Sequence, residues 1–209
     1  MPLDFLHGMW YTVCIKTRFL HIMEESVSMR RKSLYRLALS TIFAALSCVA
    51  TAVIVIPVPA TGGYINFGDC FVLLGGFCLG PYAGALAGGI GSALADLLLG
   101  YAQYVPATFV IKGLMALLAG WLSHLMRVHK RTAFIGGLIR AGIGSIAECV
   151  MIFGYFAYEA TLLGYGIGAL AAMPQNIFQG ICGLLLAALL MGLIQNIPSV
   201  RRGLAEFER

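Results

Sequence analysis

The sequence predicts an all-α fold: a polytopic membrane protein built as a bundle of six transmembrane helices, with both termini in the cytoplasm. Of its 209 residues, 60% are hydrophobic and 11% are charged, whereas an ordinary soluble domain has about 25% charged residues. Runs of about 20 apolar residues, the length that crosses a bilayer, recur from Arg36 onwards. Positive charges gather in alternate connecting segments, which is typical of membrane proteins.

Three segments are expected along the chain. Residues 1–32 form an N-terminal extension, residues 33–200 the six-helix transmembrane domain, and residues 201–209 a basic cytoplasmic tail. The extension lacks the long apolar run and the small-residue cleavage site of a signal peptide. Because Met29 directly precedes a basic segment and an apolar helix, we expect Met29 (or Met23) to be a natural start and the preceding residues to be dispensable.

The first three helices are bounded by proline and glycine. We expect a helix over 36–56, because the apolar run stops at Pro57 and Pro59 and proline interrupts a helix. The second helix, 67–79, is short for a full span and ends at Gly80-Pro81. The third, 82–99, carries glycine and alanine at four-residue spacing, so its backbone should approach its neighbours closely.

The last three helices are separated by one basic and one glycine-rich loop. Pro106 suits the first turn of a helix over 106–126. The compact basic loop Arg127–Arg131 then precedes a helix over 133–158, and a glycine-rich loop over 159–172 leads to the last helix, 173–197.

The distribution of Lys and Arg predicts the orientation. The flank at 30–36, the 127–131 loop and the tail carry ten of these residues: Arg30, Arg31, Lys32, Arg36, Arg127, Lys130, Arg131, Arg201, Arg202 and Arg209. The loops at 57–66, 100–105 and 159–172 carry none. Cytoplasmic loops of membrane proteins are enriched in Lys and Arg, so both termini are expected inside the cell. The basic segments are expected to meet anionic lipid headgroups rather than nucleic acid.

This orientation places nearly all intramembrane polar groups in the extracytoplasmic half. A cavity open to the outside, with aromatic walls and a few polar groups, is typical of small-molecule sites. The candidate ligand-binding residues are Tyr64, Asn66, Asp69, Asp96, Tyr101, Tyr104, Lys112, Glu148, Tyr155, Glu159, Asn176 and Gln179. Each also has a structural interpretation: Asp69 and Lys112 as a buried ion pair, Asp96 as a helix-end cap, the amides as links between helices, and the tyrosines as an interfacial belt.

Small residues on the first predicted helix form a candidate docking surface. Ser40, Ala44, Cys48 and Ala52 follow one another at every fourth position, and Thr41 and Ala45 lie on the adjacent row. Such rows let helices pack closely. The sequence leaves open whether Thr41, Ala44, Ala45 and Cys48 dock within the same chain or on a partner subunit.

The motifs of common enzymes and cofactor sites are missing from the sequence. There is no HExxH motif and no phosphate-binding loop ending in Lys-Ser or Lys-Thr. The six cysteines lack metal-ligand spacing, and five lie in apolar runs where a thiol behaves as a small hydrophobe. We therefore expect no enzyme activity, no catalytic residues, no metal and no cofactor.

Several motifs together resemble the substrate-binding S component of energy-coupling factor (ECF) vitamin transporters. They are TGGYINFGD, PYAGALAGGIGSALADLLLGY, PATFVIKGLMALLAG, GYFAYEA and MPQNIFQG, within a similarity that covers about residues 33–197. The resemblance implies a multi-pass plasma-membrane protein, in a bacterium, that captures a vitamin from outside. It also implies partners: a transmembrane coupling protein and two ATPase subunits. Hydroxymethylpyrimidine or a pyridoxine-like ligand fits the most similar subgroup, while riboflavin and a queuosine precursor remain open.

The resemblance also implies how the first helix meets its partner. In the family, two alanines four residues apart form the docking motif, and the matching positions here are Thr41 and Ala45, with Ala44 and Cys48 as an equal candidate.

Two other functions are compatible with the residues alone. One is a self-sufficient, proton-coupled secondary transporter that uses Asp69, Asp96 or Glu148 as a proton relay; the other is an intramembrane enzyme or scaffold.

Overall fold

The computed structural model describes residues 29–30, 33–59, 61–128 and 131–195. The basic tail and all of the expected N-terminal extension except Met29 and Arg30 therefore lie outside the described residues. The chain divides into two compact units, residues 1–38 and 39–209. All contacts below lie within the second unit.

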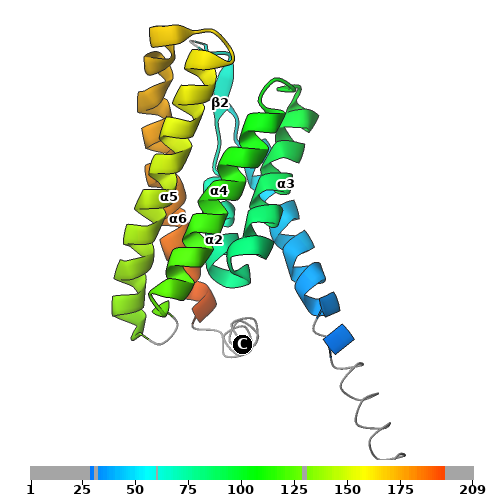
Figure 1. The fold of residues 1–209 in the computed structure, drawn as a ribbon, viewed down its shortest axis with the longest axis vertical. Coiled ribbons are helices and arrows are strands. Elements are labelled where there is room, and N and C mark those ends of the chain that lie inside the picture. The colour runs from blue at the N-terminus through cyan, green and yellow to red at the C-terminus, as the bar shows by residue number, and fades with distance from the viewer. Residues whose placement is uncertain (1–28, 31–32, 60, 129–130, 196–209) are drawn as a thin grey trace, which may run out of the picture. The chain divides into compact units, whose positions relative to one another are not determined.

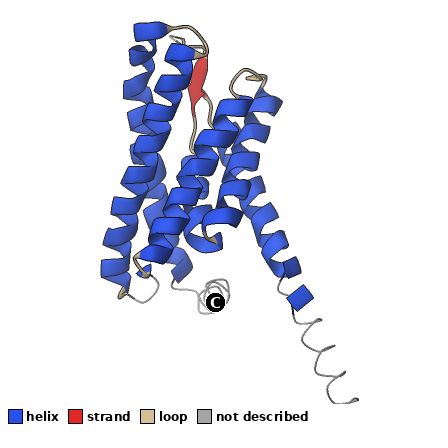
Figure 2. Cartoon of the chain, viewed as in Figure 1, coloured by secondary structure: helices blue, strands red, loops and turns tan. Residues whose placement is uncertain are grey.

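Helices make up most of the described chain (Figures 1 and 2). The elements are a first helix Ser33–Val53, strands β1 (Ile56–Val58) and β2 (Gly63–Ile65), helices α2 (Asp69–Leu79), α3 (Pro81–Leu99), α4 (Val105–Leu125) and α5 (Ala133–Thr161), the 3-10 helix η2 (Gly166–Ala172) and α6 (Met173–Gln195). The six expected helices are confirmed, and five are long and apolar enough to cross a membrane. With 11 residues, α2 is only about 16 Å long at 1.5 Å per residue.

Two connecting segments are more ordered than the sequence predicts. The expected loop over 57–66 contains an antiparallel hairpin in which Pro57 pairs with Tyr64. The β-branched residues around it favour extended backbone, and Gly62 supplies the positive φ of 65° that the turn needs. The expected loop over 159–172 begins later, because α5 continues to Thr161, and its second half forms η2.

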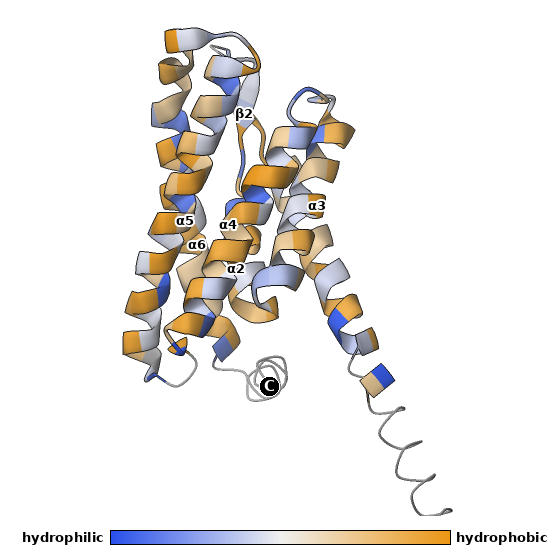
Figure 3. Cartoon of the chain, viewed as in Figure 1, coloured by the Kyte–Doolittle hydropathy of each residue, from blue (hydrophilic) through white to orange (hydrophobic). Residues whose placement is uncertain are grey.

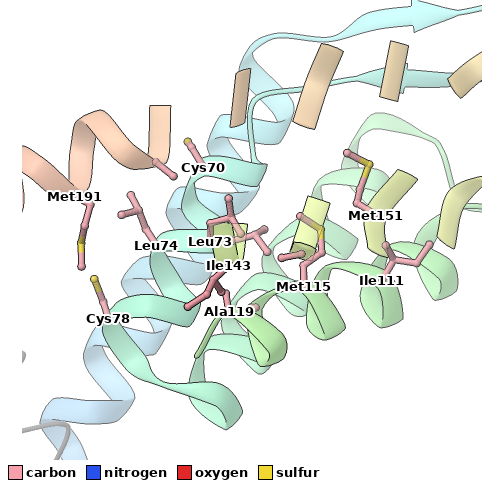
Figure 4. Packing of buried hydrophobic residues seen from close by; sticks show 14 of the residues in the cluster. Cys70, Leu73, Leu74, Cys78, Ile111, Met115, Ala119, Ile143, Met151 and Met191 are labelled. Carbon is pink, nitrogen blue, oxygen red and sulfur yellow. The ribbon is translucent and has the colours of Figure 1, made fainter. Parts of the chain in front are cut away.

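The core lies around α2, which packs against α3, α4 and α6. Nine of the eleven residues of α2 are buried, so this helix has almost no surface left for lipid. Leu73 and Leu74 of α2 meet Met115 of α4 and Met151 of α5 in one apolar cluster (Figure 4). The outer surfaces of the long helices are also apolar (Figure 3), with residues such as Leu98 and Phe134 exposed. Such surfaces require an apolar solvent, which a bilayer provides.

Glycines on α3 bring neighbouring helices into contact, as the four-residue spacing predicts. A Cβ at Gly84 would lie 2.7 Å from the Cα of Gly76 on α2. A Cβ at Gly91 would lie 2.2 Å from the carbonyl oxygen of Ala44 on the first helix. Both distances are too short for real atoms, so any larger residue at either position would push two helices apart.

Candidate ligand-binding cavity

A cavity lies between the hairpin and the helix ends beside it. It encloses about 480 Å³ of empty space, part of it open at the mouth. Its lining residues come from the first helix, the hairpin and helices α3 to α6: Thr51, Val58, Thr61, Gly63, Tyr64, Asn66, Ser92, Asp96, Tyr104, Thr108, Lys112, Tyr155, Glu159, Ala172, Asn176 and Gln179. One polar cavity is therefore assembled from segments that are more than 100 residues apart in the sequence.

An ion pair anchors one side of the cavity. Lys112 of α4 donates from Nζ to Oδ1 of Asp69, the first residue of α2, and the two side chains are 1% and 0% exposed. The ammonium group also lies 5.5 Å from the centre of the Tyr155 ring. Desolvating two charges is costly unless their remaining hydrogen-bonding positions are filled, and the neighbouring amide of Gln179 meets part of this need.

Gln179 joins the ion pair to the hairpin. Its Nε2 donates to Oδ2 of Asp69 over 2.8 Å, and its Oε1 accepts from the backbone N–H of Asn66 over 2.9 Å. Asn66 in turn accepts from the backbone N–H of Gly68 through Oδ1, also over 2.9 Å. This series of hydrogen bonds fixes α6, the end of the hairpin and the start of α2 relative to one another, so the orientation of Gln179 depends on Asp69.

Tyrosines connect the hairpin with the surrounding helices. Tyr64 of β2 donates to Oδ1 of Asp96 on α3, and its ring lies 4.5 Å from that of Tyr101, centre to centre. The hydroxyl of Tyr104 lies 3.0 Å from both the carbonyl oxygen of Thr61 and Oε1 of Glu159. Burial raises the pKa of the Tyr64 and Tyr104 phenols, so both remain neutral donors at physiological pH.

Replacing Tyr104 by phenylalanine should loosen the hairpin. Tyr104→Phe removes the hydroxyl that donates to Oε1 of Glu159 and to the carbonyl oxygen of Thr61. A buried polar group left unpaired costs about 1–3 kcal/mol, so we expect a lower Tm and faster proteolysis between β1 and β2. Tyr82→Phe, at a residue 79% exposed, is the control. Equal proteolysis rates in Tyr104→Phe and wild type would show that this hydroxyl does not hold the hairpin.

Several buried polar atoms that line the cavity have no hydrogen-bond partner within the described residues. They are Oγ1 of Thr51, Oγ1 of Thr61, Oγ of Ser92, Oδ2 of Asp96 and Oε2 of Glu159. Native proteins rarely leave such atoms unpaired, and each unpaired atom calls for an explanation. A polar ligand in the cavity would supply the missing partners.

Nine of the twelve ligand-binding residues expected from the sequence line this cavity, and three do not. Asp69 lies behind Lys112 and Gln179, and Tyr101 lies behind Tyr64. The carboxyl group of Glu148 lies against Gly180 and Gly183 of α6, outside the lining, and neither of its oxygens has a partner among the described residues. The expectation that Glu148 contacts a ligand directly thus finds no geometric support in the cavity as described.

Seven lining residues were not expected: Thr51, Val58, Thr61, Gly63, Ser92, Thr108 and Ala172. For two of them, the spacing in the sequence could have predicted a place in the site. Ser92 precedes Asp96 by four residues, and Thr108 precedes Lys112 by four, which puts each hydroxyl on the same helix face as a predicted site residue. Val58 and Ala172 carry no such signal, because an apolar residue in an apolar chain does not reveal which cavity it lines.

The candidate docking residues of the first helix point in different directions. Ala44 packs against Leu79 and Ala87, and its carbonyl is the one that Gly91 approaches. Thr41 and Ala45 are exposed, and Cys48 is half-buried. The row that contains Ala44 therefore serves contacts within the chain, whereas the row of Thr41 and Ala45 presents an open surface.

Among the described residues, no group of three or more His, Cys, Asp or Glu side chains could hold a metal ion. The carboxyl groups that line the cavity, Asp96 and Glu159, instead accept hydrogen bonds from Tyr64 and Tyr104. The arrangement is therefore suited to holding an organic ligand through hydrogen bonds and aromatic contacts.

Comparison with known proteins agrees with this architecture. Residues 31–196 match the family described as the S component of ECF-type riboflavin transporters. The thiamine precursor transporter HmpT of Lactococcus lactis subsp. cremoris is 30% identical over 169 residues, which cover 80% of this chain and 92% of that protein. An uncharacterized protein of Pyrococcus woesei is 37% identical over 138 residues, covering 66% of this chain and 86% of that protein.

A solved structure of the S component of a bacterial ECF transporter has the same fold. It aligns with a TM-score of 0.52 and 22% identity, over 84% of this chain and 98% of that chain. At this identity the likeness concerns the arrangement of the helices alone.

Proposed function

The chain belongs to the family of S components of ECF-type riboflavin transporters, and we propose that its cavity captures a vitamin or vitamin precursor from outside the cell. As a member of this family, it is a multi-pass protein of the plasma membrane. S components work with a coupling protein and ATPases. We propose that this chain delivers its ligand through such a module, formed by one transmembrane coupling protein and two ATPase subunits.

The proposed ligand is a small heteroaromatic molecule such as hydroxymethylpyrimidine or a pyridoxine-like compound. The relative from Lactococcus is described as a thiamine precursor transporter, which supports a ligand of this size. Tyr64, Tyr104 and Tyr155 offer ring surfaces on the cavity wall, and the amides of Asn176 and Gln179 offer both donors and acceptors. The observation that carries the proposal is the group of unpaired polar atoms around the cavity, because a heteroaromatic ring with polar substituents would satisfy them.

Identification of a co-purified ligand tests the proposal. The chain, purified in mild detergent from cells grown in rich medium, should carry a small heteroaromatic compound that native mass spectrometry detects and denaturation releases. Isothermal titration of the ligand-free protein with hydroxymethylpyrimidine, pyridoxine and riboflavin then ranks the candidates. An empty protein that binds none of these, nor any other vitamin in a panel, would contradict the proposal.

Uptake experiments separate the proposed function from a proton-coupled secondary transporter. The buried Glu148, without a hydrogen-bond partner among the described residues and inside the span Phe134–Thr161, is the feature that favours such a transporter. Under our proposal, proteoliposomes that contain this chain with the coupling protein and ATPases take up ligand only when ATP is supplied. Uptake by this chain alone, abolished by an uncoupler and independent of ATP, would support the rival function.

The exposed row on the first helix is the proposed contact with the coupling protein. A large side chain on this row, as in Ala45→Trp, should prevent close helix packing and reduce ATP-dependent uptake more than tenfold. Ligand affinity of the isolated chain should stay unchanged, because Ala45 is exposed and does not line the cavity. Leu138→Trp, at an exposed position on α5 that does not line the cavity, controls for bulk. Normal uptake by Ala45→Trp would exclude this row as the contact.

A further inference from the structure

We infer that the cavity selects ligands that carry no negative charge, and that Asp96 and Glu159 are the residues that enforce this selection. The inference rests on the proposed function, because it assumes that the cavity is where the ligand binds. It narrows the substrate class to neutral or cationic rings that carry hydrogen-bond donors. Vitamins that carry a carboxylate or a phosphate would be excluded.

Each of the two carboxyl groups has one oxygen engaged and one oxygen free. Asp96 accepts from Tyr64 through Oδ1, and Glu159 accepts from Tyr104 through Oε1. Oδ2 of Asp96 and Oε2 of Glu159 have no partner among the described residues, although both side chains are only 3% exposed. An ionised carboxylate can only accept hydrogen bonds, so a donor on the ligand would pair with either free oxygen.

The two free oxygens belong to different elements of the cavity wall. Asp96 lies on α3 and is bonded to the second hairpin strand, whereas Glu159 lies in the last turn of α5 and shares Tyr104 with the turn of the hairpin. A single substituent on a ligand would satisfy one of them. A ring with an amino or hydroxyl group at each of two separate positions would satisfy both.

Among the residues that the structure describes, Lys112 is the one Lys or Arg that lines the cavity, and it is already neutralised. Lys112 bonds to Asp69, which also accepts from Gln179. Recruiting this ammonium group for a ligand anion would leave Asp69 buried without a counter-ion, a costly arrangement. Around the cavity, three carboxyl groups (Asp69, Asp96 and Glu159) therefore accompany one ammonium group.

An anionic ligand would meet repulsion from ionised Asp96 and Glu159, and the described lining holds no unpaired Lys or Arg to compensate it. Interactions between charges are strong where water is largely excluded, and like charges placed side by side reject a wrong partner. A carboxyl group that takes up a proton loses this repulsion and becomes a hydrogen-bond donor. The selection against carboxylate and phosphate ligands therefore operates through the ionised groups.

Ligand pairs of matched size isolate the effect of charge. The first set of probes is hydroxymethylpyrimidine with two analogues, in which a carboxylate or a carboxamide replaces the hydroxymethyl group. The second set is pyridoxine and pyridoxic acid. Calorimetric titration of the wild-type chain should show the neutral members binding at least about 100-fold more tightly than the carboxylates. Because the carboxamide and the carboxylate have nearly the same shape, a difference between them reports charge rather than size.

Isosteric variants test the assignment to the two residues. In Asp96→Asn and Glu159→Gln, the preference for the carboxamide over the carboxylate should fall about tenfold or more, because one repulsive group is removed and an amide donor is added. Cys149→Ser, an exposed change on α5, should keep the wild-type preference. The ratio of the carboxamide affinity to the carboxylate affinity in the wild-type chain tests the selection even if a variant does not fold.

The outcomes separate this inference from the proposed function. If neutral and anionic members of a pair bind equally, or the anion binds more tightly, the selection is refuted while vitamin capture stands. If the wild type discriminates and neither variant changes the ratio, the assignment to Asp96 and Glu159 is wrong. If neither these probes nor any other vitamin in the panel binds, the proposed function fails, and this inference fails with it.

Discussion

Lys112→Met should unfold the chain at a markedly lower temperature and reduce ligand affinity by at least about 100-fold. The substitution removes the counter-ion of Asp69, whose side chain is fully buried. Breaking one half of a buried ion pair costs about 3–5 kcal/mol, because the remaining charge has neither water nor a partner. Ligand affinity should fall as well, since Asp69 also positions Gln179, which lines the cavity.

A double-mutant cycle distinguishes the ion pair from a general packing defect. Removing both charges in Lys112→Met with Asp69→Asn should restore much of the stability, because replacing both partners of a buried pair is often tolerated. Arg127→Met removes a positive charge from an exposed position just after the same helix and should have little effect. Thermal unfolding in detergent and calorimetry provide the measurements. Single variants as stable as wild type would show that the ion pair does not support the cavity.

Gly91→Ala should separate the first helix from α3. The added Cβ would lie 2.2 Å from the backbone carbonyl oxygen of Ala44 and 2.9 Å from the Cβ of Ser47. Because backbone atoms cannot turn aside as a side chain can, the whole helix must shift, and overpacking of this kind costs about 1–3 kcal/mol or more. Thr51, one turn beyond Ser47, lines the cavity, so ligand affinity should decrease with stability.

A glycine in open space provides the matched control for Gly91→Ala. No atom lies within 4 Å of a Cβ at Gly142 of α5. Gly142→Ala should therefore leave stability unchanged or raise it by up to about 1 kcal/mol, since alanine favours the helix. Thermal unfolding of the two variants side by side is the measurement. Equal melting temperatures would show that the close approach at Gly91 is not a constraint on the bundle.

The helices were predictable because long apolar runs and prolines specify where helices start and stop. The position of the polar residues along each helix was predictable for the same reason, and nine of the expected residues meet in one cavity. The rotation of each helix about its axis was not predictable from the sequence. On α3, large residues form one exposed row: Tyr82, Leu86, Ile90, Leu94 and Leu98. The small residues occupy the remaining sides, nine residues on these sides are buried, and their pattern does not reveal which of these sides faces the cavity.

Glu148 and the small residues of the first helix are two examples in which the sequence does not predict how a helix is rotated. Glu148 lies at the expected depth, but α5 turns it toward Gly180 and Gly183 rather than into the cavity. On the first helix, the rows of Ala44 and of Ala45 differ by one residue, and only the contact with Gly91 distinguishes the inward row from the exposed one. Both cases depend on contacts between segments far apart in the chain, which a local pattern does not encode.

The shortness of α2 bears on how far a ligand must travel. The hydrocarbon layer of a bilayer is about 30 Å thick, whereas α2 covers about 16 Å. The cavity rests on the first residue of this helix, through the bonds of Asp69 with Lys112 and Gln179. Under the proposed function, a ligand bound there from outside would be separated from the cytoplasm by about half of this thickness. The ATP-dependent step would then need to carry it past the length of one short helix.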